Sequence, residues 1–257
     1  MTAAYAWNDS TVLYTAMWDA MVYGVVNPLT QPSSEGGISD NPYNSAFNDY
    51  VWWGDLWGNP GLIASQSDLS RLTNNLADPA TKNFVFDGHG SVTSIGNRGD
   101  INLSKNTIGD LLGNGYTLTS KAIQRKHPYR FVFLFACDVA DLPEWSEAFG
   151  IRDEITPQQI NAHPDWVQAF LGFQGSPPAP GTGDSQAWYD NGDMLEVFFQ
   201  AWMQRSDLQQ CIAAASSPSL AWPITKQFAA GSTNSNDFKL VSYGYPWIKR
   251  TGYGPPH

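Results

Sequence analysis

The sequence has only two cysteines and four histidines among its 257 residues. Cys137 and Cys211 are too few for the disulfide framework that holds many small secreted domains together. A structural zinc site needs about four ligands, and the chain has no Cys-x-x-Cys or His-x-x-x-His pair. We therefore expect a fold without structural disulfides or zinc, and chemistry that requires no cofactor.

Positive charge and long apolar runs are also scarce. Lys and Arg total 14 against 24 Asp and Glu, a formal net charge of −10, so clustered phosphate contacts and a nucleic-acid partner are not expected. No stretch approaches the roughly 18 to 20 apolar residues of a membrane-spanning helix. Residues 1–4 show neither the basic n-region nor the continuous apolar h-region of a signal peptide. This fits a cytoplasmic protein or a domain of a larger secreted or surface protein.

What the chain does have is a globular composition, with 42% hydrophobic residues, 11 Trp and 23 Gly. Its length suits a single α/β domain. Residues 27–60 are rich in Pro, Gly and Asn, which is typical of loops. We expect residues 61–257 to form the main domain and residues 1–60 to be an N-terminal extension, a flap or an irregular first strand.

Two short apolar runs carry the chemistry. Phe84 to Phe86 leads into Asp-Gly-His-Gly, ending at His89 and Gly90, and residues 131–135 lead into Ala-Cys-Asp, with Cys137 in the middle. Such runs predict strands buried on both faces of a parallel sheet. Since chemistry in open α/β sheets sits at the carboxyl ends of strands, a thiol and an imidazole would meet there.

Helical patterns separate the expected strands, and this alternation favours a parallel sheet. We expect helices to begin at capping residues and to bury an apolar stripe. The predicted caps are Ser67, Thr107, Thr156 before Pro157, and Ser206. The predicted stripes are Leu69, Leu72 and Leu76; Ile108, Leu111 and Leu112; and Leu208, Cys211, Ile212 and Ala215, which makes Cys211 a core residue. Further strands are expected at 169–173 and 238–245.

Cys137 follows His89 by 48 positions (137 − 89). An apolar strand ending in His-Gly, followed by one ending in Ala-Cys at about this separation, resembles the caspase-like (clan CD) cysteine peptidases. The bacterial CHAT and gingipain-like branch is the most similar. The order of elements extends the resemblance over residues 65–248.

The resemblance implies a three-layer α/β/α sandwich with a central, mainly parallel six-strand sheet. It implies a Cys137 nucleophile, a His89 proton carrier, and an oxyanion hole made by the backbone N–H groups of Gly90 and Cys137. The family also has an opening strand before its His strand, and none is evident in this sequence.

The resemblance also places the substrate pocket beside the loop after the next strand, where Asp184, Trp188 and Asp190 lie. A carboxylate there would select Arg or Lys before the cut. Asp138, Asp40 and Asp49 are alternative sources of that carboxylate, and aspartates in such a loop also serve as turn formers.

Alternatives remain at this stage. The chain could be a catalytically silent caspase-like module that binds and regulates a protein partner, or a non-peptidase α/β hydrolase or transferase using the same dyad. For an enzyme, activation in this family comes from self-cleavage, calcium or flanking regulatory domains. Arg98 and Arg125-Lys126 are candidate self-cleavage sites, while His127 and His163 read as loop residues.

Overall fold

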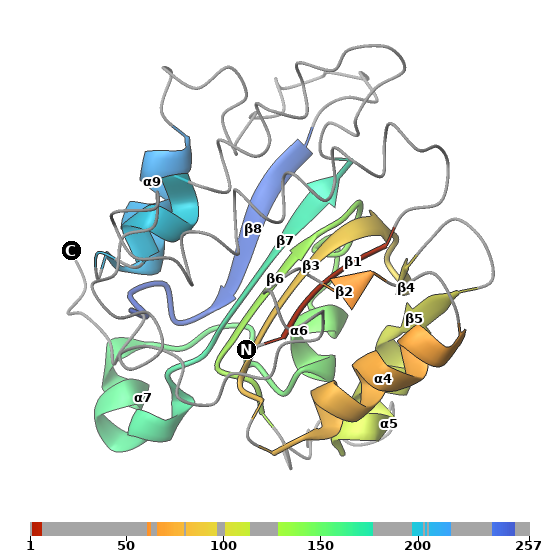
Figure 1. Ribbon diagram of the computed structural model, residues 1–257. Helices are drawn as coiled ribbons and strands as arrows, with labels where there is room; N and C mark the ends of the chain where they lie inside the picture. Colours follow the sequence, from red (N-terminus) through yellow and green to blue (C-terminus); the bar gives the residue numbers. More distant parts are fainter. Residues whose placement is uncertain are drawn as a thin grey trace.

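The computed structural model describes residues 2–6, 61–62, 66–79, 81–96, 101–113, 128–176, 197–202, 204, 206–216 and 238–249. Strands and helices alternate along these ranges (Figure 1). The strands are β1 (Thr2–Ala6), β2 (Gly61–Leu62), β3 (Asn83–Gly90), β4 (Ser94–Gly96), β5 (Asn102–Ser104), β6 (Phe131–Phe135), β7 (Ala169–Gly175) and β8 (Phe238–Gly244). The helices are α4 (Gln66–Ala77), α5 (Lys105–Leu112), α6 (Glu144–Ala148), α7 (Pro157–Ala162), the 3-10 turn η3 (Pro164–Trp166) and α9 (Leu208–Ala215).

The main sheet is mixed and mostly parallel. Its strands follow the order β2-β1-β3-β6-β7-β8, in which only β8 runs antiparallel to its neighbour. A small antiparallel sheet branches from the end of β3 through β4 and β5. The predicted α/β class with a mainly parallel sheet is therefore confirmed.

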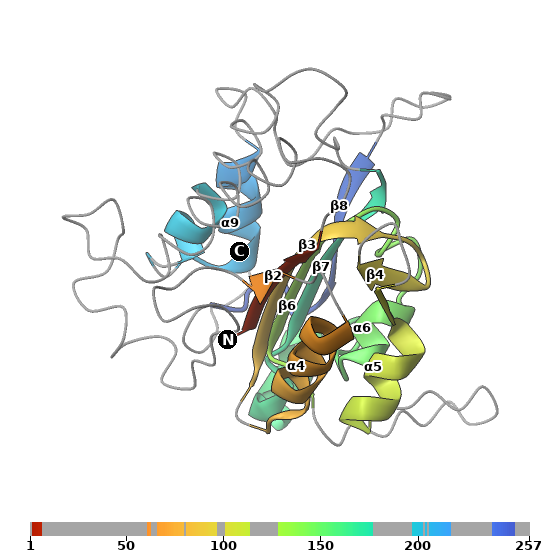
Figure 2. The same cartoon turned by 45° about the vertical axis from the view of Figure 1, so that its right-hand side comes forward.

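Helices cover both faces of the sheet (Figure 2). All five residues of β6 are buried, as the apolar run predicted, and they divide by alternation. Phe131, Phe133 and Phe135 pack with α9 and residues 197–202 on one face. Val132 and Leu134 pack with α4, α5 and α6 on the other. The two hydrophobic cores thus hold β6 in the middle of the molecule.

Two of the predicted helix starts are off by one or three residues. In α5 the N-cap is Ser104, whose Oγ accepts a hydrogen bond from the Thr107 N–H at 3.0 Å, so Thr107 lies inside the helix. In α9 the cap is Asp207, which forms a capping box with Gln210, and Ser206 precedes it. In both cases the true cap is the residue whose extended backbone lets its side chain reach the third residue ahead.

Of the remaining helix predictions, one is confirmed and two are wrong. Thr156 and Pro157 start α7 with a complete capping box, as predicted. The prediction of Ser67 as a cap is wrong, because α4 begins at Gln66 and Ser67 lies in its first turn. Leu111 was predicted to share the buried stripe of α5 but is 37% exposed, because only Ile108, Gly109 and Leu112 are turned inward.

Residues 2–6 supply the opening strand that the sequence did not reveal. β1 pairs in parallel with β3, from Thr2 opposite Phe84 to Ala6 opposite Gly88. The hairpin of β4 and β5 was also missed, because strands of three residues leave no periodic signal. No helix among the described residues is long and apolar enough to cross a membrane.

Candidate active site

The pairing of β3 with β6 brings His89 and Cys137 to the same level. Each pair joins residues 48 positions apart, from Asn83 opposite Phe131 to Asp87 opposite Phe135. His89 and Cys137 have this same separation, and each lies two residues beyond the last pair. Both therefore stand at the carboxyl edge of the sheet, on neighbouring chain segments.

Gly90 and the turn that begins at Cys137 are in direct contact. A Cβ placed on Gly90 would lie 2.6 Å from the Cβ of Ala136 and 2.8 Å from the carbonyl oxygen of Cys137. Real Cβ atoms do not approach so closely, so only glycine fits this position without a shift of the backbone. The residue after His89 is thus pressed against the segment that carries Cys137.

The two cysteines occupy different surroundings. Cys137 is not part of a disulfide, and the residue is half-buried. Cys211 is completely buried in the core under α9, and burial raises the pKa of its thiol well above the ordinary value. This confirms Cys211 as a small core residue. The imidazole of His89 is half-buried, and its Nε2 atom is screened from solvent.

Residues 137–140 form a turn that is fastened to the end of β7, and we call them the Cys137 turn. The Asp138 N–H donates to the Gly175 carbonyl at 2.9 Å, and the Ala140 N–H donates to the Phe173 carbonyl at 3.0 Å. From the other side, the Tyr243 hydroxyl donates to the Ala140 carbonyl at 3.0 Å. These bonds fix the backbone that directly follows the thiol.

Asp138 has an unusual backbone. Its φ is 57°, and within the described part of the chain no other non-glycine residue has a positive φ. This left-handed conformation is tolerated better by Asp and Asn than by most residues with a Cβ. Burial, reinforced by the negative charge of Asp141, raises the pKa of the Asp138 carboxyl. The turn therefore holds a carboxylate whose charged form is disfavoured next to the thiol.

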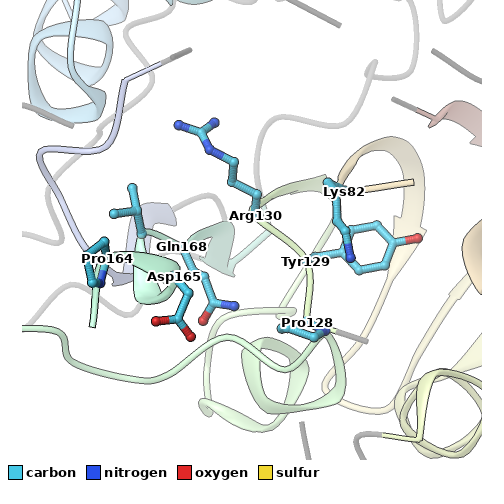
Figure 3. A pocket seen from close by; sticks show the side chains of 8 residues that line it. Lys82, Pro128, Tyr129, Arg130, Pro164, Asp165 and Gln168 are labelled. Carbon is cyan, nitrogen blue, oxygen red and sulfur yellow. The ribbon is translucent and has the colours of Figure 1, made fainter. Parts of the chain in front are cut away.

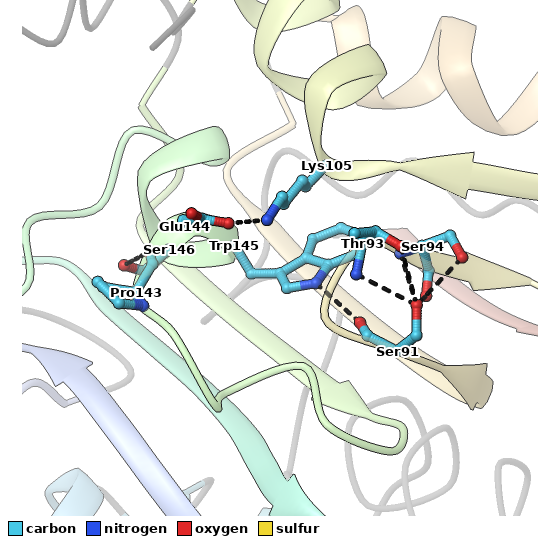
Figure 4. A network of polar contacts seen from close by, with 8 residues as sticks. All are labelled: Ser91, Thr93, Ser94, Lys105, Pro143, Glu144, Trp145 and Ser146. Atoms are coloured by element: carbon cyan, nitrogen blue, oxygen red, sulfur yellow. Dashed lines mark hydrogen bonds and ion pairs between the residues drawn. The ribbon is translucent and has the colours of Figure 1, made fainter. Parts of the chain in front are cut away.

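The segment after His89 is held by a polar network (Figure 4). The Trp145 indole N–H donates to the Ser91 carbonyl at 3.2 Å. Glu144 forms an ion pair with Lys105 at the start of α5. Burial lowers the pKa of Lys105, and the negative charge of Glu147 opposes that effect. These contacts join α6, which follows the Cys137 turn, to the β4–β5 side of the molecule.

Several predicted site residues lie outside the described part of the chain. They are Asp184, Trp188 and Asp190 of the expected substrate pocket, the alternatives Asp40 and Asp49, the cleavage candidates Arg98, Arg125 and Lys126, and His127. His163 is described. It stacks on Trp166 with ring centroids 4.0 Å apart, just before β7 begins, and so lies at the opposite edge of the sheet from His89.

A pocket of about 390 Å³, which no sequence pattern predicts, opens at that opposite edge (Figure 3). Lys82, Arg130 and Gln168 line it, each just before a parallel strand begins. The Arg130 guanidinium donates to the Lys249 carbonyl, and burial lowers its pKa to about 10. Because this pocket lies at the amino ends of the strands, it is separate from the His89 and Cys137 edge.

Comparison with known proteins returned no matching family model and no matching curated protein. Among the described residues, no group of three or more His, Cys, Asp or Glu side chains converges as a metal site. Support for a function therefore comes from the motifs and from the geometry around His89 and Cys137.

Proposed function

We propose that this chain is a cysteine endopeptidase that uses Cys137 as nucleophile and His89 as proton carrier. The observation that supports this most strongly is the shared register of the two residues at the carboxyl edge of β3 and β6. A thiol and an imidazole on adjacent strand ends can form the activated pair that thiol catalysis needs. A structural thiol gains nothing from this placement, and the other thiol, Cys211, is buried in the core.

The proposed reaction has two steps. The Cys137 thiolate attacks the scissile carbonyl, the C–N bond breaks, and the imidazolium of His89 gives its proton to the departing amine. A water molecule then attacks the thioester while His89 takes one of its protons, the C–S bond breaks, and the acid leaves with the thiolate and imidazolium restored. Both steps pass through an oxyanion that must be stabilised by hydrogen-bond donors.

We assign those donors to the backbone N–H groups of Gly90 and Cys137. The bare Cα of Gly90 lies against Ala136 and the Cys137 carbonyl, so the two backbone segments are adjacent. Donors held by a sheet and a fastened turn are pre-organised, because they need no rearrangement as charge develops.

The proposal includes the caspase-like architecture of three α/β/α layers around a six-strand sheet. The resemblance calls for a strand before the His strand, and β1 occupies that place beside β3. The two helical layers on opposite faces support the same assignment. Residues 61–257 would then form the peptidase domain together with β1 from the N-terminal segment.

For the substrate we propose a polypeptide cut after Arg or Lys. The Asp138 carboxylate lies next to the nucleophile and is a candidate to bind a basic side chain. The candidates Asp184, Trp188 and Asp190 lie outside the described residues. A charge of −10 would also attract basic substrates over long range. Calcium or flanking domains are the proposed activators.

The test is turnover of a mixed fluorogenic peptide library by the wild type, Cys137→Ala and His89→Ala, with and without calcium. We expect cleavage after basic residues in the wild type and at least a thousandfold loss in both variants, the scale on which an intact dyad acts. Absence of cleavage by folded wild type under both conditions would favour the alternative, a silent module that binds and regulates a protein.

A further inference from the structure

His89 lies between two fixed points of the backbone. Before it, Gly88 pairs with Ala6 of β1, and Asp87 pairs with Phe135 of β6. At His89 the strand leaves β6 and pairs instead with β4, opposite Gly96. The placement of His89 therefore depends on what holds the segment beyond it.

That segment is closed by Ser91. Its Oγ accepts hydrogen bonds from the Thr93 N–H at 3.1 Å and the Ser94 N–H at 3.0 Å. Its own N–H donates to the Ser94 carbonyl at 2.9 Å. These bonds make the turn rigid within itself, but all of them are local to residues 91–94. On the side of β5 and α5, the turn is fastened by the Lys105 N–H, which donates to the Thr93 carbonyl at 3.1 Å. None of these bonds reaches the segment that follows Cys137.

Trp145 supplies a connection to the other half of the site. Its side chain is only 1% exposed, and its indole N–H donates to the Ser91 carbonyl. A buried indole N–H that loses its acceptor costs free energy, so this bond favours one position of the turn. Trp145 lies on α6, eight residues after Cys137 (145 − 137), so the bond joins the segment after His89 to the segment after Cys137 (Figure 4).

We propose that Trp145 is a positioning residue that fixes His89 relative to Cys137 through the Ser91 carbonyl. The inference rests on the proposed dyad. Loss of the indole N–H would free the 91–94 turn from α6 while the sheet still holds Gly88, so the displacement would fall on His89 and Gly90. Misplacement of a catalytic group by about 1 Å can cost up to about a hundredfold in rate.

The test compares Trp145→Phe with Tyr129→Phe. Both changes keep a buried ring and remove one donor to a backbone carbonyl, since the Tyr129 hydroxyl donates to the Leu76 carbonyl at 2.8 Å. Tyr129 lies just before β6 begins, at the edge of the sheet away from the dyad. We expect similar losses in melting temperature. We expect Trp145→Phe to lower kcat about tenfold while its KM stays within about twofold of the wild-type value. Tyr129→Phe should change neither constant.

A second readout does not require peptidase activity. The rate of Cys137 alkylation by iodoacetamide at pH 7, followed by peptide mass spectrometry, should fall several-fold in Trp145→Phe and remain at the wild-type value in Tyr129→Phe. If His89→Ala slows alkylation while Trp145→Phe does not, the positioning role is wrong and the dyad stands. If His89→Ala has no effect on either alkylation or turnover, the proposed function itself is wrong.

Discussion

Gly172 of β7 lies directly against Val139 of the Cys137 turn: a Cβ on Gly172 would stand 2.8 Å from Cγ2 of Val139. The other methyl group of Val139, Cγ1, is 3.0 Å from the position that a Cβ on Gly90 would occupy. Val139 thus fills the space between the backbones of two strands, β3 and β7, and it can do so only because each strand has a glycine there.

We predict that Gly90→Ala and Gly172→Ala each destabilise the protein by about 1–3 kcal/mol, because the added methyl group overpacks a close contact. Val139→Ala should reduce the destabilisation caused by Gly172→Ala, because the atom nearest to the added methyl group belongs to the Val139 side chain. Val139→Ala should not reduce the destabilisation caused by Gly90→Ala, because the atoms nearest to that added methyl group are the Ala136 Cβ and the Cys137 carbonyl oxygen. Urea unfolding of the single and double variants gives both coupling energies. Equal relief in both cycles would contradict the described packing.

A second prediction concerns Asp138. Asp138→Asn keeps a side chain that tolerates the positive φ and removes the carboxylate. Because burial and Asp141 raise the pKa of this carboxyl, the folded protein accommodates its charge less favourably than the unfolded chain does. We therefore expect equal or slightly higher stability, measured as melting temperature at pH 7.

The same variant tests the substrate proposal. If Asp138 binds the basic side chain, the preference of kcat/KM for Arg or Lys peptides over neutral ones should collapse in Asp138→Asn. An unchanged preference would assign that role to the loop that carries Asp184 and Asp190. Asp138→Val is the matched steric control, and we expect it to lower stability by about 1–2 kcal/mol because a β-branched residue is strained at positive φ.

The third prediction is a loss of stability at alkaline pH. Burial, with a smaller contribution from Asp207, raises the pKa of Cys211, whose value in the unfolded chain is near 8.5. The folded state therefore holds this proton more tightly. Its contribution to stability is complete below about pH 8.5 and is lost as pH rises, with a slope approaching about 1.4 kcal/mol per pH unit.

The measurement compares the free energy of unfolding of Cys137→Ala with that of Cys137→Ala/Cys211→Ala between pH 7 and 10. The double variant should show the flatter curve up to about pH 10. Above that, Tyr129 should lower the stability of both, since burial and then Asp78 raise the pKa of its phenol as well. Parallel curves over the whole range would mean that Cys211 is not buried as described.

Sequence reasoning located β3 and β6 because their continuous apolar runs can be satisfied only when both faces of a strand are buried. The placement of His89 and Cys137 at the same edge of the sheet could be predicted as well, because each residue comes directly after one of these two apolar runs. β1 was missed because five residues, Thr2–Ala6, mostly alanine, carry almost no hydrophobic pattern. Its place is set by pairing with β3, which no local sequence feature reports.

Helix boundaries were less predictable than helix faces. Ser104 and Thr107 are both good caps, and their choice depends on where β5 ends. The contact between Trp145 and Ser91 could not be predicted, because two residues 54 positions apart leave no trace in local sequence. The packing of Gly90 and Gly172 against Val139 could not be predicted either, because it depends on the relative positions of β3, β7 and the Cys137 turn.

The antiparallel direction of β8 has a practical consequence. β1 begins with Thr2 beside Phe84, and β8 ends with Gly244 beside Ala169. Of the described strands, the first therefore enters and the last leaves at the same edge of the sheet. His89 and Cys137 lie at the other edge. A tether attached next to either strand at that shared edge would therefore present the thiol side outward, which makes the protein suited to oriented capture on a sensor surface.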